Sequence, residues 1–135
     1  MVEQTTRYGI GTTIERPYGD AVTRVKDELA NEGFGVLCEI DVAATLRAKL
    51  GVEFRPYVIL GACNPPLAHR ALEAEPELGA LLPCNVIVYA GDGGTRIAAI
   101  DPERMLSIVE NDALAEVAAD VKARLARVVE RAVTA

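Results

Sequence analysis

The sequence predicts an α+β fold in which helices pack on one face of a mainly antiparallel sheet. Five short segments rich in Val, Ile and Thr have the character of strands, and the last two are separated only by Gly91-Asp92-Gly93-Gly94, which suits a tight hairpin turn. The C-terminal third carries one apolar stripe at helical spacing. Packing a sheet against amphipathic helices buries the apolar faces of both. The predicted order is strand, helix, four strands and helix (β-α-β-β-β-β-α), with short helices inserted between strands.

The first third of the chain reads as strand, helix and strand. Residues 8–16 alternate and are rich in Thr and Ile, which predicts the first strand. From residue 18 apolar side chains recur at the spacing of one helical face, and Gly33 stands where helices commonly end. Residues 34–40 are apolar and partly β-branched, which predicts the second strand. Cys38 lies inside that strand, where we expect it to serve in packing.

Two short helices are predicted on either side of the third strand. Asp41 can accept a hydrogen bond from the free amides of a helix over residues 42–50. Residues 56–63 form an apolar strand, which stops at Asn64-Pro65-Pro66 because two successive amide hydrogens are missing. The first of these prolines favours an extended backbone at the residue before it, which is the conformation of a helix cap. A second short helix should therefore follow over residues 66–74.

The rest of the chain is predicted to form a hairpin and two helical segments. After a loop through Gly79, residues 84–89 return as a strand and pair with residues 95–100 across the glycine-rich turn. Asp101, which precedes a proline, reads as the cap of a short helical turn over residues 102–109. The long helix that follows carries an apolar stripe made of Leu114, Val117, Ala118, Val121, Leu125, Val128 and Ala132.

The composition favours one domain spanning residues 1–135 and argues against two classes of partner. The chain has 20 acidic and 14 basic side chains, a formal charge of -6, and no run of Lys and Arg that could follow a phosphate backbone. We therefore expect no nucleic acid partner. No apolar run approaches the roughly 18 to 20 residues of a membrane span, so we expect no membrane insertion. Met1–Arg7 is polar and lacks the apolar stretch of an export signal, so we expect a cytoplasmic protein.

The chemically active residues gather around two Cys-Asn pairs. Cys63-Asn64 ends one strand and Cys84-Asn85 begins another, so both pairs lie at the same end of the sheet if those strands are antiparallel neighbours. The chain has an odd number of cysteines and no export signal, so we expect reduced thiols rather than a disulfide framework. The simplest interpretation is that the cysteines are small buried hydrophobes and the asparagines are caps or turn formers.

His69 is the only histidine, and a lone histidine on a surface helix is usually just solvated. About one helical turn beyond Asn64, it could instead lean back toward Cys63 and act as the base of a thiol enzyme. The consecutive prolines weaken this hypothesis, because they leave only later amides, such as that of Leu67, to stabilise a thiolate. Cys63, Cys84 and His69 also make a three-ligand set for zinc or iron, although no close cysteine pair of the zinc-finger type is present.

Four strings of residues resemble the domain-of-unknown-function family numbered three-hundred-and-two (DUF302) over nearly the whole chain. The resemblance implies an α+β fold like that of the TATA-binding protein, with one strand, a helix, four strands and a helix, and it implies a homodimer. It implies no established activity, and the acidic charge argues against carrying DNA binding over from the fold's namesake. The strings are Glu39-Ile40-Asp41-Val42, Phe54-Arg55-Pro56-Tyr57, Leu60-Gly61-Ala62-Cys63-Asn64-Pro65 and Leu82-Pro83-Cys84-Asn85-Val86.

Three functional hypotheses follow. The first is a binding module that holds a small ligand or a metal ion at the Cys-Asn end of the sheet, which fits polar groups without a complete catalytic set. The second is a thiol enzyme or redox protein that uses Cys63 or Cys84 with His69 as base. The third is a structural or dimer-forming interaction domain. The sequence favours the first and indicates no particular cofactor. The candidate ligand-binding residues are Cys63, Asn64, His69, Cys84 and Asn85.

Overall fold

A computed structural model describes residues 6–134 of the chain. Most of the Met1–Arg7 segment, on which the prediction of no export signal rests, lies outside the described residues. The strands are β1 (Gly9–Ile14), β2 (Gly35–Asp41), β3 (Tyr57–Cys63), β4 (Cys84–Gly91) and β5 (Gly94–Ile100). The α-helices are α1 (Tyr18–Asn31), α2 (Val42–Leu50), α3 (Pro65–Ala74), α4 (Pro102–Ser107) and α5 (Ala115–Thr134). Two short 3-10 helices are η1 (Pro76–Leu81) and η2 (Asp112–Leu114).

The five strands form one sheet in the order β1-β5-β4-β3-β2, and every neighbouring pair is antiparallel. The predicted α+β class, the antiparallel sheet and the β-α-β-β-β-β-α order are therefore confirmed. Local chemistry explains why the elements begin where they do. The Asp41 carboxylate accepts a hydrogen bond from the amide of Ala44 at 2.9 Å and caps α2, while Gly51 ends that helix with φ of 68°.

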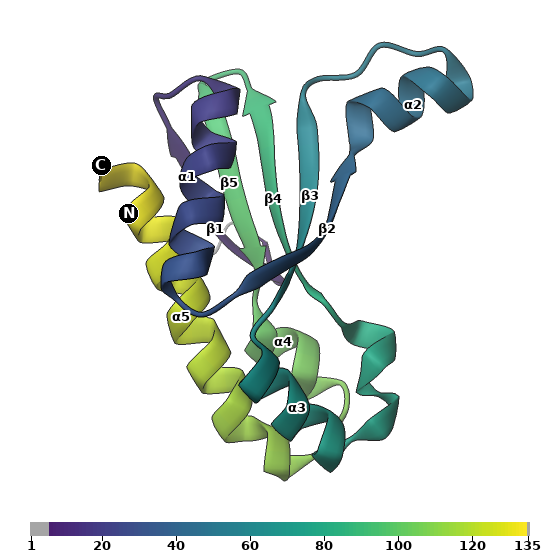
Figure 1. Cartoon of the computed structure of the whole chain (residues 1–135), viewed down its shortest axis with the longest axis vertical. Helices are drawn as coiled ribbons and strands as arrows, with labels where there is room; N and C mark the ends of the chain where they lie inside the picture. The colour runs from purple at the N-terminus through teal and green to yellow at the C-terminus, as the bar shows by residue number, and fades with distance from the viewer. Residues whose placement is uncertain (1–5, 135) are drawn as a thin grey trace.

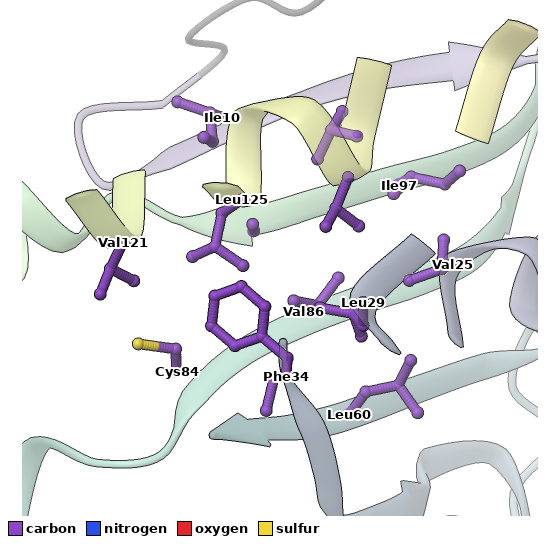
Figure 2. Packing of buried hydrophobic residues seen from close by; sticks show 14 of the residues in the cluster. Ile10, Val25, Leu29, Phe34, Leu60, Cys84, Val86, Ile97, Val121 and Leu125 are labelled. Atoms are coloured by element: carbon purple, nitrogen blue, oxygen red, sulfur yellow. The ribbon is translucent and has the colours of Figure 1, made fainter. Parts of the chain in front are cut away.

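The two long helices α1 and α5 cover one face of the sheet, and the hydrophobic core lies between them and the strands. Figure 2 shows the Phe34 ring among Leu29, Val86 and Leu125, with Cys84 at the edge of the cluster. The shorter helices lie elsewhere: α3 and α4 extend beyond one end of the sheet, and α2 stands off beyond the β2–β3 edge (Figure 1). Helices α3 and α4 therefore cover the end of the sheet where β3 ends and β4 begins (Figure 1).

Two details differ from the sequence-based prediction. The loop predicted through Gly79 is largely the 3-10 helix η1, whose Leu78 is buried. Cys38 is exposed rather than packed in the core. The reason is that β2 is an edge strand with little burial along its length and an irregular register between Val36 and Cys38. Within residues 6–134, none of the helices combines the length and the apolar character that crossing a bilayer requires.

Candidate functional site

An apolar cavity of about 320 Å³ lies at the end of the sheet where β3 stops and β4 starts, among α3, η1, α4 and α5. Its walls come from segments far apart in the sequence. No charged side chain is among the residues that line it, which are Phe34, Leu37, Ala62, Cys63, Asn64, Leu67, Ala68, Ala71, Leu72, Leu78, Gly79, Leu82, Pro83, Cys84, Pro102, Met105, Leu106, Val117 and Val121.

The two Cys-Asn pairs lie at the same end of the sheet, as predicted, because β3 and β4 are antiparallel neighbours and Ala62 is opposite Cys84 in their register. Both cysteines line the cavity. Cys84 is buried and Cys63 is half-buried. Burial, with a smaller contribution from the nearby Cys63, raises the pKa of the Cys84 thiol to about 11. Cys84 is therefore a neutral thiol at neutral pH, which makes it a poor nucleophile.

Asn64 forms the start of α3 and one wall of the cavity. Its side-chain oxygen accepts a hydrogen bond from the amide of Leu67 at 3.3 Å, and its side-chain nitrogen donates to the carbonyl of Glu32 at 3.4 Å. Pro65 and Pro66 occupy the first helical positions and have no amide hydrogen. The sequence analysis considered the Leu67 amide as a donor that could stabilise a thiolate at Cys63. In the structure this amide donates to Asn64 instead.

Asn64 contacts Glu32, which lies in a cluster of charged side chains that the sequence analysis did not predict. The carboxylate of Glu32, only 7% exposed, receives three hydrogen bonds from the Arg127 guanidinium and one from Arg131 at 3.0 Å. Its backbone carbonyl also accepts a bond from Arg124 at 3.0 Å. The bond from Arg127 is the main reason that the pKa of Glu32 is lowered. This cluster, which we call the Glu32 brace, ties the end of α1 to α5 beside the cavity.

His69 and Asn85 do not line the cavity. The His69 imidazole lies on the outside of α3, with 75% of its side chain exposed and its Nε2 3.0 Å from the carboxylate of Glu73. Asn85 is exposed and lines a separate hollow of about 490 Å³ on the opposite face of the sheet, because successive residues of a strand point to opposite faces. Of the five candidate ligand-binding residues, only Cys63, Asn64 and Cys84 therefore lie together at one site.

The three-ligand metal set proposed from the sequence is not assembled in the described residues. Among residues 6–134, no group of three or more His, Cys, Asp and Glu side chains is placed to hold a metal ion. The residues that the sequence analysis missed are the apolar walls of the cavity, such as Leu78 of η1 and Met105 of α4. Their only sequence signal was an apolar residue inside a short helical segment, which does not distinguish a cavity wall from ordinary core.

The chain is similar to known proteins in sequence and in fold. Residues 10–132 match the family described as "Domain of unknown function DUF302". The crystal structure of an uncharacterized conserved protein DUF302 from Bacillus stearothermophilus is similar in fold, with a TM-score of 0.87 and 34% sequence identity over 93% of this chain and 98% of that one. A search of curated proteins gave no match. The likeness to the TATA-binding protein fold stays a prediction.

Proposed function

The chain belongs to the DUF302 family, and from that premise we propose that it is a binding module for a small, predominantly apolar molecule held in the cavity at the Cys-Asn end of the sheet. The observation that carries this proposal is the absence of any charged side chain from the cavity lining. A charged ligand would lose its hydration there without gaining a charge partner, whereas an apolar ligand gains from leaving water.

The polar groups of the cavity lining have few free hydrogen-bond donors or acceptors for a ligand. The Asn64 side chain already bonds both Leu67 and Glu32, and no buried side-chain nitrogen or oxygen among the described residues lacks a partner. Cys84 is a neutral thiol, which is a weak donor and a weak acceptor. Apolar contact is therefore the main source of affinity, and the half-buried thiol of Cys63 is the polar group best placed to orient the ligand.

The volume of the cavity sets the size of the ligand. An apolar cavity of about 150 Å³ is enough for benzene, and sites for small molecules begin near 300 Å³. At about 320 Å³, this cavity fits a two-ring aromatic compound or an aliphatic chain of medium length. Leu37 and Leu72, which are 67% and 37% exposed, belong both to the lining and to the surface. Their position supports an apolar entrance between β2 and α3.

The other hypotheses have less support from the geometry. A thiol enzyme that pairs Cys63 with His69 would need the imidazole to leave Glu73 and cross to the cavity side of α3. A metal-binding role would need ligands that the described residues do not bring together. The homodimer that the family resemblance implies stays a prediction. We also propose a cytoplasmic location, which is supported by the three free cysteines.

Binding of naphthalene and 1-decanol, with glucose as the polar control, tests the proposed function. Either apolar probe at about ten times its dissociation constant should raise the Tm of the wild type by about 3 to 6 °C, since ligand binding to the folded state alone stabilises it. Glucose should produce no shift. Isothermal titration calorimetry should give a stoichiometry of one probe per chain. Absence of binding by both apolar probes to the wild type would overturn the proposal.

A pair of variants in α3 locates the binding site. Ala68 lines the cavity, and Ala68→Phe should fill part of the space and lower probe affinity at least tenfold. Ala74 is an exposed residue at the end of the same helix and is not part of the lining, so Ala74→Phe should bind the probes as the wild type does. Equal affinity in both variants would place the probes elsewhere on the protein and contradict the proposed site.

A further inference from the structure

The face of the sheet opposite α1 and α5 carries a hollow of about 490 Å³ that is separate from the apolar cavity. We call it the tyrosine hollow, since three of the four tyrosines of the chain line it. Its walls come from β3, β4, β5 and the residues at the start of β1, and none of the described lining residues also lines the apolar cavity. The lining residues are Thr6, Tyr8, Gly9, Tyr57, Asn85, Ile87, Tyr89, Arg96, Ala98, Ala99 and Ile100.

Small residues keep the floor of the tyrosine hollow low. In the register of the sheet, Ala98 of β5 lies between Gly11 of β1 and Ile87 of β4. A Cβ atom on Gly11 would lie 2.9 Å from the Cβ of Ala98 and 2.9 Å from a terminal nitrogen of the Arg96 guanidinium. Because Gly11 has no Cβ, this guanidinium fits against the backbone of β1. The positive charge of Arg96 therefore lies next to the floor of the hollow.

The tyrosines form an aromatic wall with hydroxyl groups at its edge. Tyr57 of β3 and Tyr89 of β4 are opposite each other in the register, and their rings stack with centroids 5.1 Å apart and planes 5° apart. Burial raises the pKa of Tyr57, with smaller contributions from the nearby Tyr89 and Tyr8. This phenol is therefore a neutral hydrogen-bond donor at neutral pH. The wall thus presents ring surface for a planar ligand and phenolic donors for a negatively charged or polar group.

The charge of the tyrosine hollow has the opposite sign to that of the whole chain. The chain carries a formal charge of -6, yet none of the described residues in the lining is acidic and Arg96 is basic. Arg96 donates a hydrogen bond to the Thr13 hydroxyl at 3.4 Å, and a guanidinium keeps its positive charge whatever its partners are. Arg55 adds a second cation, with its guanidinium carbon 5.8 Å from the ring centroid of Tyr89. The hollow is therefore a local positive site that attracts anions.

We propose that the tyrosine hollow is a second small-molecule site, which binds an aromatic carboxylate with its ring against the tyrosine wall and its carboxylate at Arg96. The planar guanidinium matches the two oxygens of a carboxylate, and the rings add stacking surface. The amide of Asn85 is a further donor in the same lining. A neutral apolar ligand gains no charge partner here, so the two sites take ligands of different classes. The proposal does not depend on the proposed function, because the two linings share no described residue.

The side-chain amide signals of two asparagines in the nitrogen-15 NMR spectrum of the full chain show which site a probe occupies. Asn85 lines the tyrosine hollow and Asn64 lines the apolar cavity. The probe 2-naphthoate should shift the Asn85 signals and leave those of Asn64 unchanged, whereas naphthalene should do the reverse. Absence of any Asn85 shift at about 5 mM 2-naphthoate, above the millimolar dissociation constant of a weak site, would overturn the proposal. So would a shift of the Asn64 signals alone.

Isothermal titration calorimetry tests the part played by the carboxylate and by Arg96. The neutral analogue 2-naphthamide should bind the hollow at least tenfold more weakly than 2-naphthoate, because it cannot form charge-assisted hydrogen bonds with the guanidinium. Arg96→Gln should weaken 2-naphthoate binding at least tenfold for the same reason, and Arg96→Lys should keep part of the affinity. The matched control is Arg47→Gln, which changes an exposed arginine of α2 outside both linings and should bind as the wild type does.

Two further variants separate this proposal from loss of folding and from the proposed function. Ala98→Phe should fill the floor of the hollow and weaken 2-naphthoate binding, with the far-UV circular dichroism of the wild type. Ala68→Phe, which fills part of the apolar cavity, should bind 2-naphthoate as the wild type does, so each site can fail without the other. Wild-type affinity for 2-naphthoate in folded Arg96→Gln and Ala98→Phe would overturn the proposal.

Discussion

The side-chain amide of Asn64 donates a hydrogen bond to the backbone carbonyl of Glu32, with 3.4 Å between nitrogen and oxygen. The same side chain caps α3 through the amide of Leu67. One residue thereby joins the end of α1 to the start of α3, and it does so in the wall of the cavity. The asparagine of the first Cys-Asn pair is thus a structural link beside the proposed ligand, while the asparagine of the second pair faces the other side of the sheet.

This difference between the two asparagines can be measured directly. Asn64→Ala should lower the free energy of unfolding by about 1 to 2 kcal/mol, because it removes a helix cap and leaves the Glu32 carbonyl with one bond fewer. Asn85→Ala, the matched change in the exposed asparagine, should alter it by less than about 0.5 kcal/mol. Urea denaturation provides the comparison. An equal loss of unfolding free energy in the two variants would show that the hydrogen bonds of Asn64 do not stabilise the fold more than an exposed asparagine does.

The Glu32 brace predicts a pH dependence in the acid range. The arginines, Arg127 first, hold the folded-state pKa of Glu32 below its usual 4.5, so its stabilising contribution is present above pH 4.5 and is lost as the pH falls through the folded-state value. Glu32→Gln should therefore be less stable than the wild type at pH 7, and the gap should close as the pH falls toward 3.

The control for the brace is Glu130→Gln on the exposed side of α5, which should follow the wild-type curve at every pH. Urea denaturation at pH 7, 5, 4 and 3 gives the curves for all three proteins. A gap between Glu32→Gln and the wild type that stays constant from pH 7 to pH 3 would rule out the ionised carboxylate as its source.

Cys84 predicts a second pH dependence in the alkaline range. Burial raises its pKa from 9.0 in the unfolded chain to about 11 in the folded one. The folded state therefore keeps the proton longer, and stability is full below pH 9 and falls as the pH rises toward 11. Over this window the wild type should lose up to about 2 to 3 kcal/mol more than Cys84→Ala, at about 1.4 kcal/mol per pKa unit.

Denaturation at pH 8, 9.5 and 11 measures this loss, and Cys38→Ala serves as the control because Cys38 is exposed. That variant should lose stability in parallel with the wild type. If Cys84→Ala also follows the wild type, the Cys84 thiol ionises as easily in the folded protein as in the unfolded chain, and its burial in the cavity wall has no effect on its acidity.

Local sequence signals predicted most elements within one or two residues. The helix over residues 42–50 was predicted with its observed bounds, because its capping aspartate and terminal glycine act within a few residues of the chain. The proximity of the two Cys-Asn pairs was also predictable, since an antiparallel register places the end of one strand beside the start of the next. Exposure of Cys38 was not predictable, because an apolar strand reads the same at the edge of a sheet as at its centre.

The sequence by itself determined the α+β class, the order of the elements, and the end of the sheet at which Cys63 and Cys84 meet, because periodicity, caps and proline breaks are local. Only the tertiary structure decided that His69 and Asn85 point away from that site and that Glu32 is buried under arginines of α5. It also decided that an uncharged cavity lies between α3, α4 and α5. The physical reason is that burial and cavities arise from the packing of segments distant in the chain, which no local spacing encodes.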